Sequence, residues 1–379
     1  MYKGRIGEEE NMFWDNHVIR EDLEEVYGRE INWERLRNKT IFITGAYGML
    51  TSYLVFLCIY LNEIHQYGMR LILAVRSKEK AGKRFGRFLE EEYIELYLKD
   101  INEPIAVEGH VDYVIHGASL ASTQYYGTVP IDVILPNISG TVQLLKLAEE
   151  HKSEGFLLFS SGEIYGKVDS SVSMITEETM GTSDTMNLRN CYCESKRMAE
   201  MLCCAWFHQK NVPAKAVRIC HTYGPTMDIE GDARVFSAFV NDIINNRNIV
   251  MNSEGLVKRP FCYLADATAG FFQILLEGKP GEAYNLCNSK EFLSIRQLAE
   301  LLTGLYPQKG LKVEKRIPEG QGLIPKREEN EVGISDEKLK ALGWTCKYDT
   351  REGFHRTIES LLQEKKNMER IDRDEDQRN

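Results

Sequence analysis

The chain has 379 residues, of which 43% are hydrophobic, and a net charge of -10 at pH 7. A chain of this size can bury a large core, as two domains or as one domain with an added lobe. The acidic balance, without a long basic block, argues against a nucleic-acid surface, so we expect small-molecule partners. The longest apolar run, residues 50–61, is too short to span a bilayer, and we expect no membrane-embedded segment.

Nine cysteines are scattered along the chain without the paired spacing of a disulfide framework. Cys191-x-Cys193 and the pair Cys203-Cys204 lack a second ligand pair at zinc spacing, so we predict no metal site. The first ten residues lack the apolar core of a signal peptide. These features together predict a reducing, cytoplasmic location.

The chain begins with charged and aromatic residues in alternation over positions 1–38, which predicts a helical extension packed on the main domain. A β-rich run at 40–44 then leads directly into a glycine turn and an apolar helical run. Glycines let the backbone approach a ligand closely, and a helix N-terminus offers N–H groups to a pyrophosphate. The spacing is Gly-x-x-Gly, with Thr51 at the position of a third glycine. We predict a cofactor-binding turn formed by Gly45, Tyr47, Gly48 and Met49.

The second strand, at 71–75, ends in Arg76. An acidic residue there would bind the ribose of NAD, whereas an arginine suits the 2′-phosphate of NADP. A solvated basic turn is an equally good interpretation of Arg76, so both cofactors stay open. Asp100, after the next strand, is a candidate for the adenine edge. The small residues after the strand at 113–116 let backbone lie against the cofactor at Ala118, and His116 is predicted to be a packed strand-end residue.

The fifth strand, at 156–159, delivers Ser161 and Glu163 to the carboxyl end of the sheet, where parallel α/β folds bind ligands. Tyr192 and Lys196 follow at a separation of four, which places them on one face of a helix. A nearby ammonium favours the phenolate and so predicts a base. A tyrosine and a lysine at this spacing are a common coincidence, so the pair gains meaning only from the residues around it.

Strands and helices alternate regularly through Pro225, which predicts an α/β fold with a Rossmann-type, doubly wound parallel sheet over residues 39–225. Beyond it, shorter elements predict a smaller C-terminal substrate-binding lobe at 226–363, with some segments returning to the sheet. The highly charged residues 364–379 predict a disordered tail.

With these motifs assembled, the chain resembles the extended short-chain dehydrogenase/reductases of the NAD-dependent epimerase/dehydratase family. Within that family it is most similar to the UDP-glucuronate decarboxylases, also called UDP-xylose synthases. The stretches with this resemblance are 44–48, 118–122, 130–131, 161, 189–197, 222–227, 259–263 and 285–288.

The resemblance implies that Ser161 and Tyr192 hold the sugar C4 hydroxyl, and that Lys196 binds the nicotinamide ribose and lowers the pKa of Tyr192. NAD would then take hydride from C4. It also implies that Glu163 and Arg259 lie beside the C5 and C6 end of the sugar, where a C4 ketone lets the carboxylate leave as CO2. A UDP-linked substrate and a homodimer are implied as well. The substrate-binding positions are assigned to Ser122, Arg189, Arg234 and Arg259.

Gly162 stands where the resembled family has a hydroxyl-bearing residue. A 4,6-dehydratase needs an acid at this position to expel the C6 hydroxyl, so Gly162 disfavours that alternative. A 4-epimerase needs little beyond Ser161, Tyr192 and Lys196, and it stays open. A non-catalytic nucleotide-sensing module is the alternative from another class, although it would have no reason to keep these three residues together.

Overall fold

The computed structural model of the chain describes residues 14–232, 234–316 and 332–378. The first thirteen residues of the predicted N-terminal extension lie outside the described residues, as do residues 233 and 317–331 of the predicted C-terminal lobe and the final Asn379. Among the described residues, the structure has no helix that combines the length and apolar character needed to cross a membrane.

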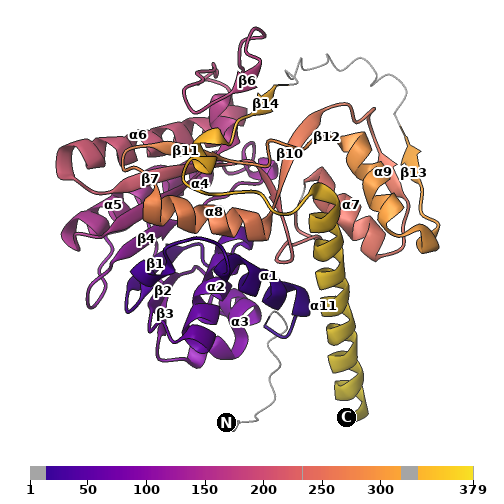
Figure 1. The fold of residues 1–379 in the computed structure, drawn as a ribbon, viewed down its shortest axis with the longest axis horizontal. Helices are drawn as coiled ribbons and strands as arrows, with labels where there is room; N and C mark the ends of the chain where they lie inside the picture. The colour runs from indigo at the N-terminus through magenta and orange to yellow at the C-terminus, as the bar shows by residue number, and fades with distance from the viewer. Residues whose placement is uncertain (1–13, 233, 317–331, 379) are drawn as a thin grey trace.

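Seven parallel strands form the central sheet in the order β3-β2-β1-β4-β5-β7-β11 (Figure 1). The strand order reverses between β1 and β4, which is where doubly wound folds bind their ligands. The predicted α/β fold with a doubly wound parallel sheet is therefore confirmed. The strands are β1 (Thr40–Thr44), β2 (Arg70–Ala74), β3 (Ile94–Tyr97), β4 (Tyr113–His116), β5 (Gly155–Ser161), β7 (Ala214–Ile219) and β11 (Ala283–Leu286).

Helices cover both faces of this sheet. Successive strand residues point to opposite faces, and on β1 Ile43 joins the core under α2 and α8, whereas Phe42 joins the core under α5 and α6. Both residues are fully buried. The helices of this domain are α2 (Met49–His65), α3 (Lys78–Phe85), α4 (Pro130–Leu135), α5 (Thr141–Glu150), α6 (Cys191–Lys210) and α8 (Leu264–Glu277).

The described part of the N-terminal extension forms α1 (His17–Tyr27) and a 3-10 turn, η1 (Trp33–Leu36). Helix α1 packs against α2, α8 and α11. Its fully buried Asp22 accepts hydrogen bonds from Tyr53 Oη and Tyr263 Oη, each at 2.5 Å, and from Arg356 Nε at 2.9 Å. One carboxylate thus joins α1 to three other segments of the chain.

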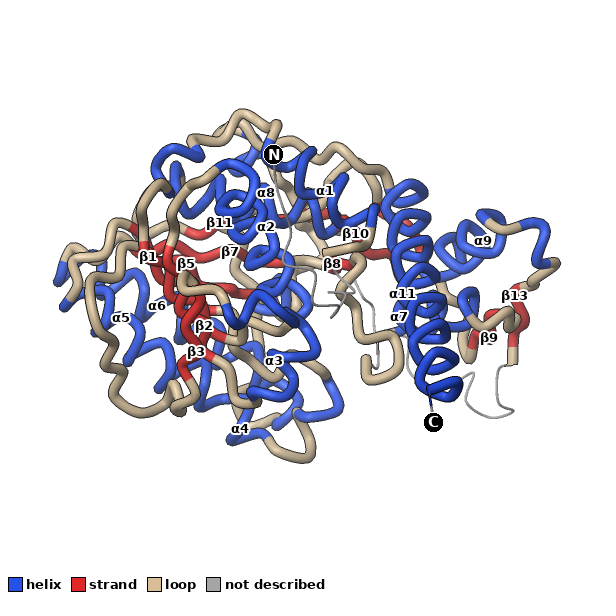
Figure 2. The backbone as a smooth tube through the Cα atoms, turned by 90° about the horizontal axis from the view of Figure 1, so that it is seen from below, coloured by secondary structure: helices blue, strands red, loops and turns tan. Residues whose placement is uncertain are grey.

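The remaining elements form a smaller unit beside the sheet. Strand β10 pairs in parallel with β8 and antiparallel with β12, and β13 pairs with β9. Helix α9 and strands β9 and β13 lie on the far side of α11 from the central sheet (Figure 2). The bounds are β8 (His221–Tyr223), β9 (Ile249–Met251), β10 (Lys258–Tyr263), β12 (Phe292–Ser294), β13 (Val313–Lys315), α7 (Val235–Ile244), α9 (Ile295–Leu305), α10 (Glu337–Lys340) and α11 (Thr350–Arg378), with β6 (Met174–Ile175) pairing β14 (Gly333–Ile334) elsewhere.

The charged tail was predicted to be disordered from residue 364, but α11 continues through Arg378. Near the start of this tail, Lys365 Nζ donates a hydrogen bond to Asn245 Oδ1 at 2.9 Å. This bond anchors the middle of α11 to the C-terminus of α7. The sequence also places opposite charges four residues apart, at 365/369 and 369/373, and such pairs stabilise a helix. A composition typical of disorder is therefore compatible here with a helical backbone.

Candidate active site

A cavity of about 330 Å³ opens at the carboxyl ends of β1, β2 and β4. Its lining includes the backbone segment 117–120 after β4 and Pro136 at the end of α4. Six predicted cofactor residues are among the residues that line it, so the structure brings them together at one cavity. These six are Gly45, Tyr47, Gly48, Arg76, Asp100 and Ala118.

The glycine turn has the geometry of a phosphate cradle. Gly45 has a φ of +65°, and a Cβ on it would lie 2.9 Å from Ala118 Cα, closer than real Cβ contacts. Gly48 is the N-cap of α2, and no side chain in the described part of the chain caps this helix end. The unpaired N–H groups and the positive end of the helix dipole therefore face an anion site beside the cavity. The residues present fit a dinucleotide.

His116 at the end of β4 lies next to this cavity and contacts Pro136, which lines it. It is 1% exposed, and its ring nitrogens lie 2.8 Å from Thr44 Oγ1 and 3.0 Å from Pro136 O. Burial lowers the pKa of His116 to about 3, with Lys196 adding to the effect, so the imidazole is neutral. Pro136 begins a π-helical turn, Pro136–Gly140, between α4 and α5. His116 is thus the packed strand-end residue that the sequence predicted.

Tyr192 and Lys196 lie on the first two turns of α6, with exposed fractions of 7% and 2%. The Lys196 ammonium donates to Phe159 O at 2.6 Å and lies 5.7 Å from the Tyr192 ring centroid. Burial lowers the pKa of Lys196 to about 7 and raises the pKa of Tyr192 to about 12. The expectation that Lys196 lowers the Tyr192 pKa is therefore not met, because removal from water disfavours the charged form of both groups.

Three predicted residues act on the pKa of the Tyr192 phenol. After burial, a hydrogen bond with Ser161 is the largest influence on the Tyr192 pKa and lowers it, Glu163 raises it, and Arg234 lowers it. Ser161 Oγ also accepts a hydrogen bond from the Glu163 N–H at 3.1 Å. The structure therefore brings the strand end of β5 and an arginine of the smaller unit to the same phenol.

Arg234 connects this phenol to the glycine turn and to a second arginine. Its guanidinium pairs with Asp232 at 2.5 Å and lies 3.6 Å from Met49 Sδ. Both Arg234 and Arg259 lower the pKa of His221, which burial and these two cations hold at about 3. Arg259, on β10, is half-buried and donates to Lys258 O at 2.9 Å. Two cations therefore flank one neutral imidazole at the start of β8.

Some predicted residues have other surroundings. Arg189, predicted to bind the substrate, is exposed, and its guanidinium carbon lies 4.9 Å from the ring centroid of Tyr126. Ser122 is half-buried in the loop between Ala118 and Tyr126. The sequence reasoning passed over Tyr126 altogether, because no motif marks it. His221 was not among the predicted site residues either, although its place directly before the Thr-Tyr-Gly-Pro stretch at 222–225 could have marked it.

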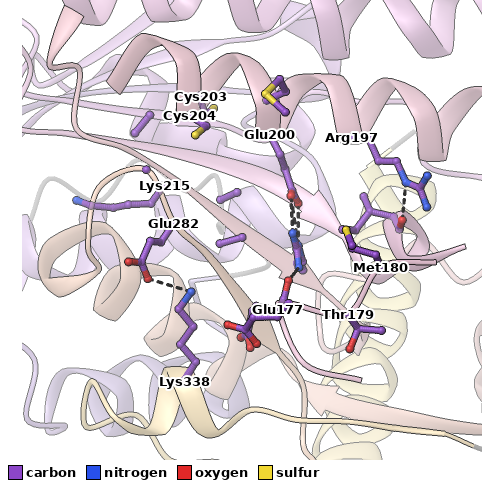
Figure 3. Close-up of a pocket in the computed structure, with 18 of the residues that line it drawn as sticks. Glu177, Thr179, Met180, Arg197, Glu200, Cys203, Cys204, Lys215, Glu282 and Lys338 are labelled. Carbon is purple, nitrogen blue, oxygen red and sulfur yellow. Dashed lines mark hydrogen bonds and ion pairs between the residues drawn. The ribbon is translucent and has the colours of Figure 1, made fainter. Parts of the chain in front are cut away.

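A larger cavity, of about 550 Å³, lies behind α6 beside β7 and β11 (Figure 3). Its charged side chains are paired, for example Glu200 with Arg218 at 2.9 Å and Glu282 with Lys338 at 3.0 Å. Its lining contains none of the predicted site residues. In the described ranges there is also no group of three or more His, Cys, Asp or Glu placed to hold a metal ion. The predicted site residues that line a cavity are therefore found at the smaller of these two cavities.

Comparisons with known proteins agree with this geometry. The NAD dependent epimerase/dehydratase family matches residues 41–287. UDP-glucuronic acid decarboxylase 6 of Arabidopsis thaliana is 32% identical over 319 residues, which cover 84% of this chain and 87% of that protein. UDP-glucuronic acid decarboxylase 1 of Xenopus tropicalis is 30% identical over 326 residues, covering 86% of this chain and 73% of that protein.

Solved structures show the same fold. The UDP-glucose 4-epimerase of Thermotoga maritima has a TM-score of 0.69 at 19% identity, covering 85% of this chain and 98% of its own. The dTDP-glucose 4,6-dehydratase of Streptomyces venezuelae, solved with NAD bound, has a TM-score of 0.69 at 19% identity, with 85% and 96% covered. From the matched sequence and fold together, the chain is an enzyme of the NAD dependent epimerase/dehydratase family.

Proposed function

We propose that the enzyme decarboxylates UDP-glucuronate after oxidising its C4, giving UDP-xylose or the corresponding 4-keto sugar. The observation that supports this most is that Ser161 hydrogen bonds with the Tyr192 phenol and that the charges of Glu163 and Arg234 both act on it. The charges of Arg234 and Arg259 both act on His221, and Arg234 also lies 3.6 Å from Met49 Sδ after the glycine turn. A phenol and two cations are thus combined in the part of the fold that contains the glycine turn of the cavity. The relatives named UDP-glucuronic acid decarboxylases support the substrate class.

In this proposal Tyr192 takes the proton of the C4 hydroxyl, and Ser161 orients that hydroxyl by hydrogen bonding. Lys196 holds the nicotinamide ribose. When bound, the oxidised nicotinamide cofactor accepts hydride from C4 and adds a positive charge that favours the phenolate. The favourable charge matters because burial, together with the surrounding groups, raises the pKa of Tyr192 to about 12, too high for a base near neutrality.

Arg259 is proposed to hold the C6 carboxylate, since a guanidinium forms a bidentate pair with a carboxylate. Oxidation at C4 makes this carboxylate β to a ketone. The C5–C6 bond then breaks, CO2 leaves, and the electron pair passes into the C4 enolate. Glu163, which is exposed and whose charge acts on the Tyr192 phenol, is proposed to deliver the proton that C5 must regain. Return of the hydride to C4, with the proton from Tyr192, would then give UDP-xylose, whereas release before this step would give the 4-keto sugar and leave the cofactor reduced.

We propose NAD as the cofactor, in keeping with the family, and Arg76 at the cavity keeps NADP as the alternative. We likewise propose a homodimer in the cytoplasm. Among other reactions, a 4-epimerase would use the same Ser161, Tyr192 and Lys196 but would give Arg259 no carboxylate to bind. Gly162 disfavours a 4,6-dehydratase, and a non-catalytic sensing module does not account for the grouping around Tyr192.

The test is a product assay with purified protein and UDP-glucuronate labelled with 14C at the carboxyl carbon. Release of labelled CO2 is expected, whereas turnover of UDP-glucose or UDP-galactose without it would overturn the proposal. The Tyr192→Phe variant should lower turnover by a factor of about 10² to 10⁴, the usual contribution of a general acid-base group. Tyr60→Phe, on α2 near its C-terminal end, is the matched control and should retain full turnover.

A further inference from the structure

The ring of Tyr192 rests on a second tyrosine. The Tyr126 and Tyr192 ring centroids are 5.3 Å apart, and the ring planes differ by only 11°. Both side chains are buried, at 3% and 7% exposure. With Val133 they form an apolar cluster of their own, separate from the cores on the two faces of the sheet. The orientation of the Tyr192 ring is therefore set mainly within this small cluster.

Tyr126 is itself held in place from several sides. Its hydroxyl donates to Ala121 O at 2.9 Å, and its backbone N–H donates to Thr123 O at 3.3 Å. The Arg189 guanidinium carbon lies 4.9 Å from its ring centroid, within the range of a cation–π contact. Arg189 belongs to the short 3-10 turn η6 (Leu188–Asn190) immediately before α6. The ring is thus clamped between the loop after β4 and the start of the helix that bears Tyr192.

We propose that Tyr126 is a positioning residue whose ring fixes the Tyr192 ring for proton transfer. The inference rests on the proposed function, because it takes Tyr192 as the proton acceptor. Flat aromatic pairs have a preferred stacked geometry, so a ring at this place restricts how the neighbouring ring can turn. A proton acceptor must lie within hydrogen-bond reach of its substrate, and a displacement of about 1 Å is enough to slow the reaction strongly.

Tyr126 belongs to the same loop as residues that line the cofactor cavity. Residues 117–120 line the cofactor cavity, and the Tyr126 hydroxyl is bonded to the carbonyl of the next residue, Ala121. The backbone that would touch a dinucleotide and the ring that supports the proton acceptor therefore belong to one short loop.

The test compares Tyr126→Leu, which removes the ring, with Tyr126→Phe, which keeps it. We expect Tyr126→Leu to lower kcat for UDP-glucuronate by about 10-fold to 100-fold. KM and the dissociation constant for NAD, measured by protein fluorescence, should stay within about 3-fold, because binding groups are untouched. Removing the Tyr126 ring should also let water reach the Tyr192 phenol and so lower its pKa. The acid limb of the kcat–pH profile should therefore move to lower pH. Tyr126→Phe should restore kcat to within about 3-fold of the wild type.

Tyr125→Leu is the matched control, since Tyr125 is half-buried in the same cluster but does not stack on Tyr192. Its kcat should stay near that of the wild type. Unchanged kcat in Tyr126→Leu would overturn the inference, and so would a Tyr126→Phe variant as slow as Tyr126→Leu. If circular dichroism shows that Tyr126→Leu does not fold, Arg189→Gln at the exposed end of the contact replaces it. A fall in kcat is then expected, and a change in KM alone would overturn the inference.

The outcomes also separate this inference from the proposed function. If the wild-type enzyme releases no CO2 from UDP-glucuronate, the proposed function fails before Tyr126 is considered. If the wild type is active, Tyr192→Phe is inactive and Tyr126→Leu is fully active, the proposed function stands and only the positioning role of Tyr126 is lost.

Discussion

The methyl group of Thr51 lies in the space that a Cβ on Gly117 would occupy. Thr51 stands where dinucleotide-binding turns have their third glycine, whose role is to let helix and strand pack closely. Its hydroxyl donates to Gly45 O at 2.5 Å, so it also braces the turn. In this chain α2 carries Thr51 instead of a third glycine. The close approach of α2 to the strand end is possible because the facing residue, Gly117 after β4, has no side chain.

This relationship predicts that Gly117→Ala weakens cofactor binding, because the added methyl group overlaps the Thr51 methyl group beside the cavity. We expect the dissociation constant for NAD, measured by titration calorimetry, to rise at least about 10-fold, the scale of overpacking a tight contact. Thr51→Ser removes the methyl group but keeps the hydroxyl. The double variant Gly117→Ala/Thr51→Ser should therefore bind NAD nearly as the wild type does, whereas additive losses would show that the two residues are not in conflict.

The elements with a local pattern could be predicted from the sequence. The glycine turn at Gly45 and Gly48 follows a strand and precedes a helix, and each step has its own residue preferences. Ser161 and Glu163 could be placed because parallel strands end at one edge of a sheet. These predictions needed only the order of elements along the chain.

The parts that escaped prediction depend on contacts between distant segments. Tyr126 meets Tyr192, and Thr51 meets Gly117, only after the sheet has formed. The sign of the Tyr192 pKa shift was wrong for the same reason, since the spacing shows that Lys196 is near but not how deeply both groups are buried. The helix in the charged tail was not predicted because amino-acid composition gives hydrophobicity and charge but not how charges are spaced along a helix.

Arg76 is expected to select the cofactor. It is exposed at the end of β2 and lines the cavity together with Lys99, where a 2′-phosphate would be neutralised. Arg76→Glu should lower the affinity for NADP relative to NAD by at least about 10-fold, measured as the ratio of the two dissociation constants. Lys83→Glu makes the same charge change on the exposed face of α3, outside the cavity lining, and should leave the ratio unchanged. An unaltered ratio in Arg76→Glu would show that Arg76 is only a solvated turn residue.

Arg259 should distinguish a carboxylated sugar from an uncharged one. Arg259→Met removes the guanidinium that the proposal assigns to the C6 carboxylate, and kcat/KM for UDP-glucuronate should fall by about 10²-fold or more, as for a lost charged hydrogen bond. Binding of UDP-glucose, which has no carboxylate, should change by no more than about 3-fold. Arg247→Met, an exposed arginine of the same unit paired with Asp242, serves as the control. Equal losses for both sugars would contradict a carboxylate-binding role.

Asp22 should make the stability of the fold depend on pH. Burial raises its pKa from 3.8 to about 6, against the opposing effects of Arg356, Tyr263 and Tyr53. Because the folded chain then binds this proton more tightly than the unfolded chain, the stabilisation is fully present below about pH 4 and is lost as the pH rises through about 6.

Relative to Asp22→Asn, which does not titrate, the wild type should therefore lose roughly 2 to 2.5 kcal/mol of unfolding free energy between pH 4 and pH 7, which is most of the effect expected at 1.36 kcal/mol for each pKa unit. Guanidinium unfolding of both proteins across this range measures the difference. Glu21→Gln changes an exposed carboxylate on the same helix that pairs with the same Arg356 at 3.1 Å, and its difference from the wild type should stay nearly flat. The opposite result is that the unfolding free energy of the wild type, relative to Asp22→Asn, does not change with pH or increases with it. This would mean that Arg356 and the two tyrosines outweigh burial and keep Asp22 ionised.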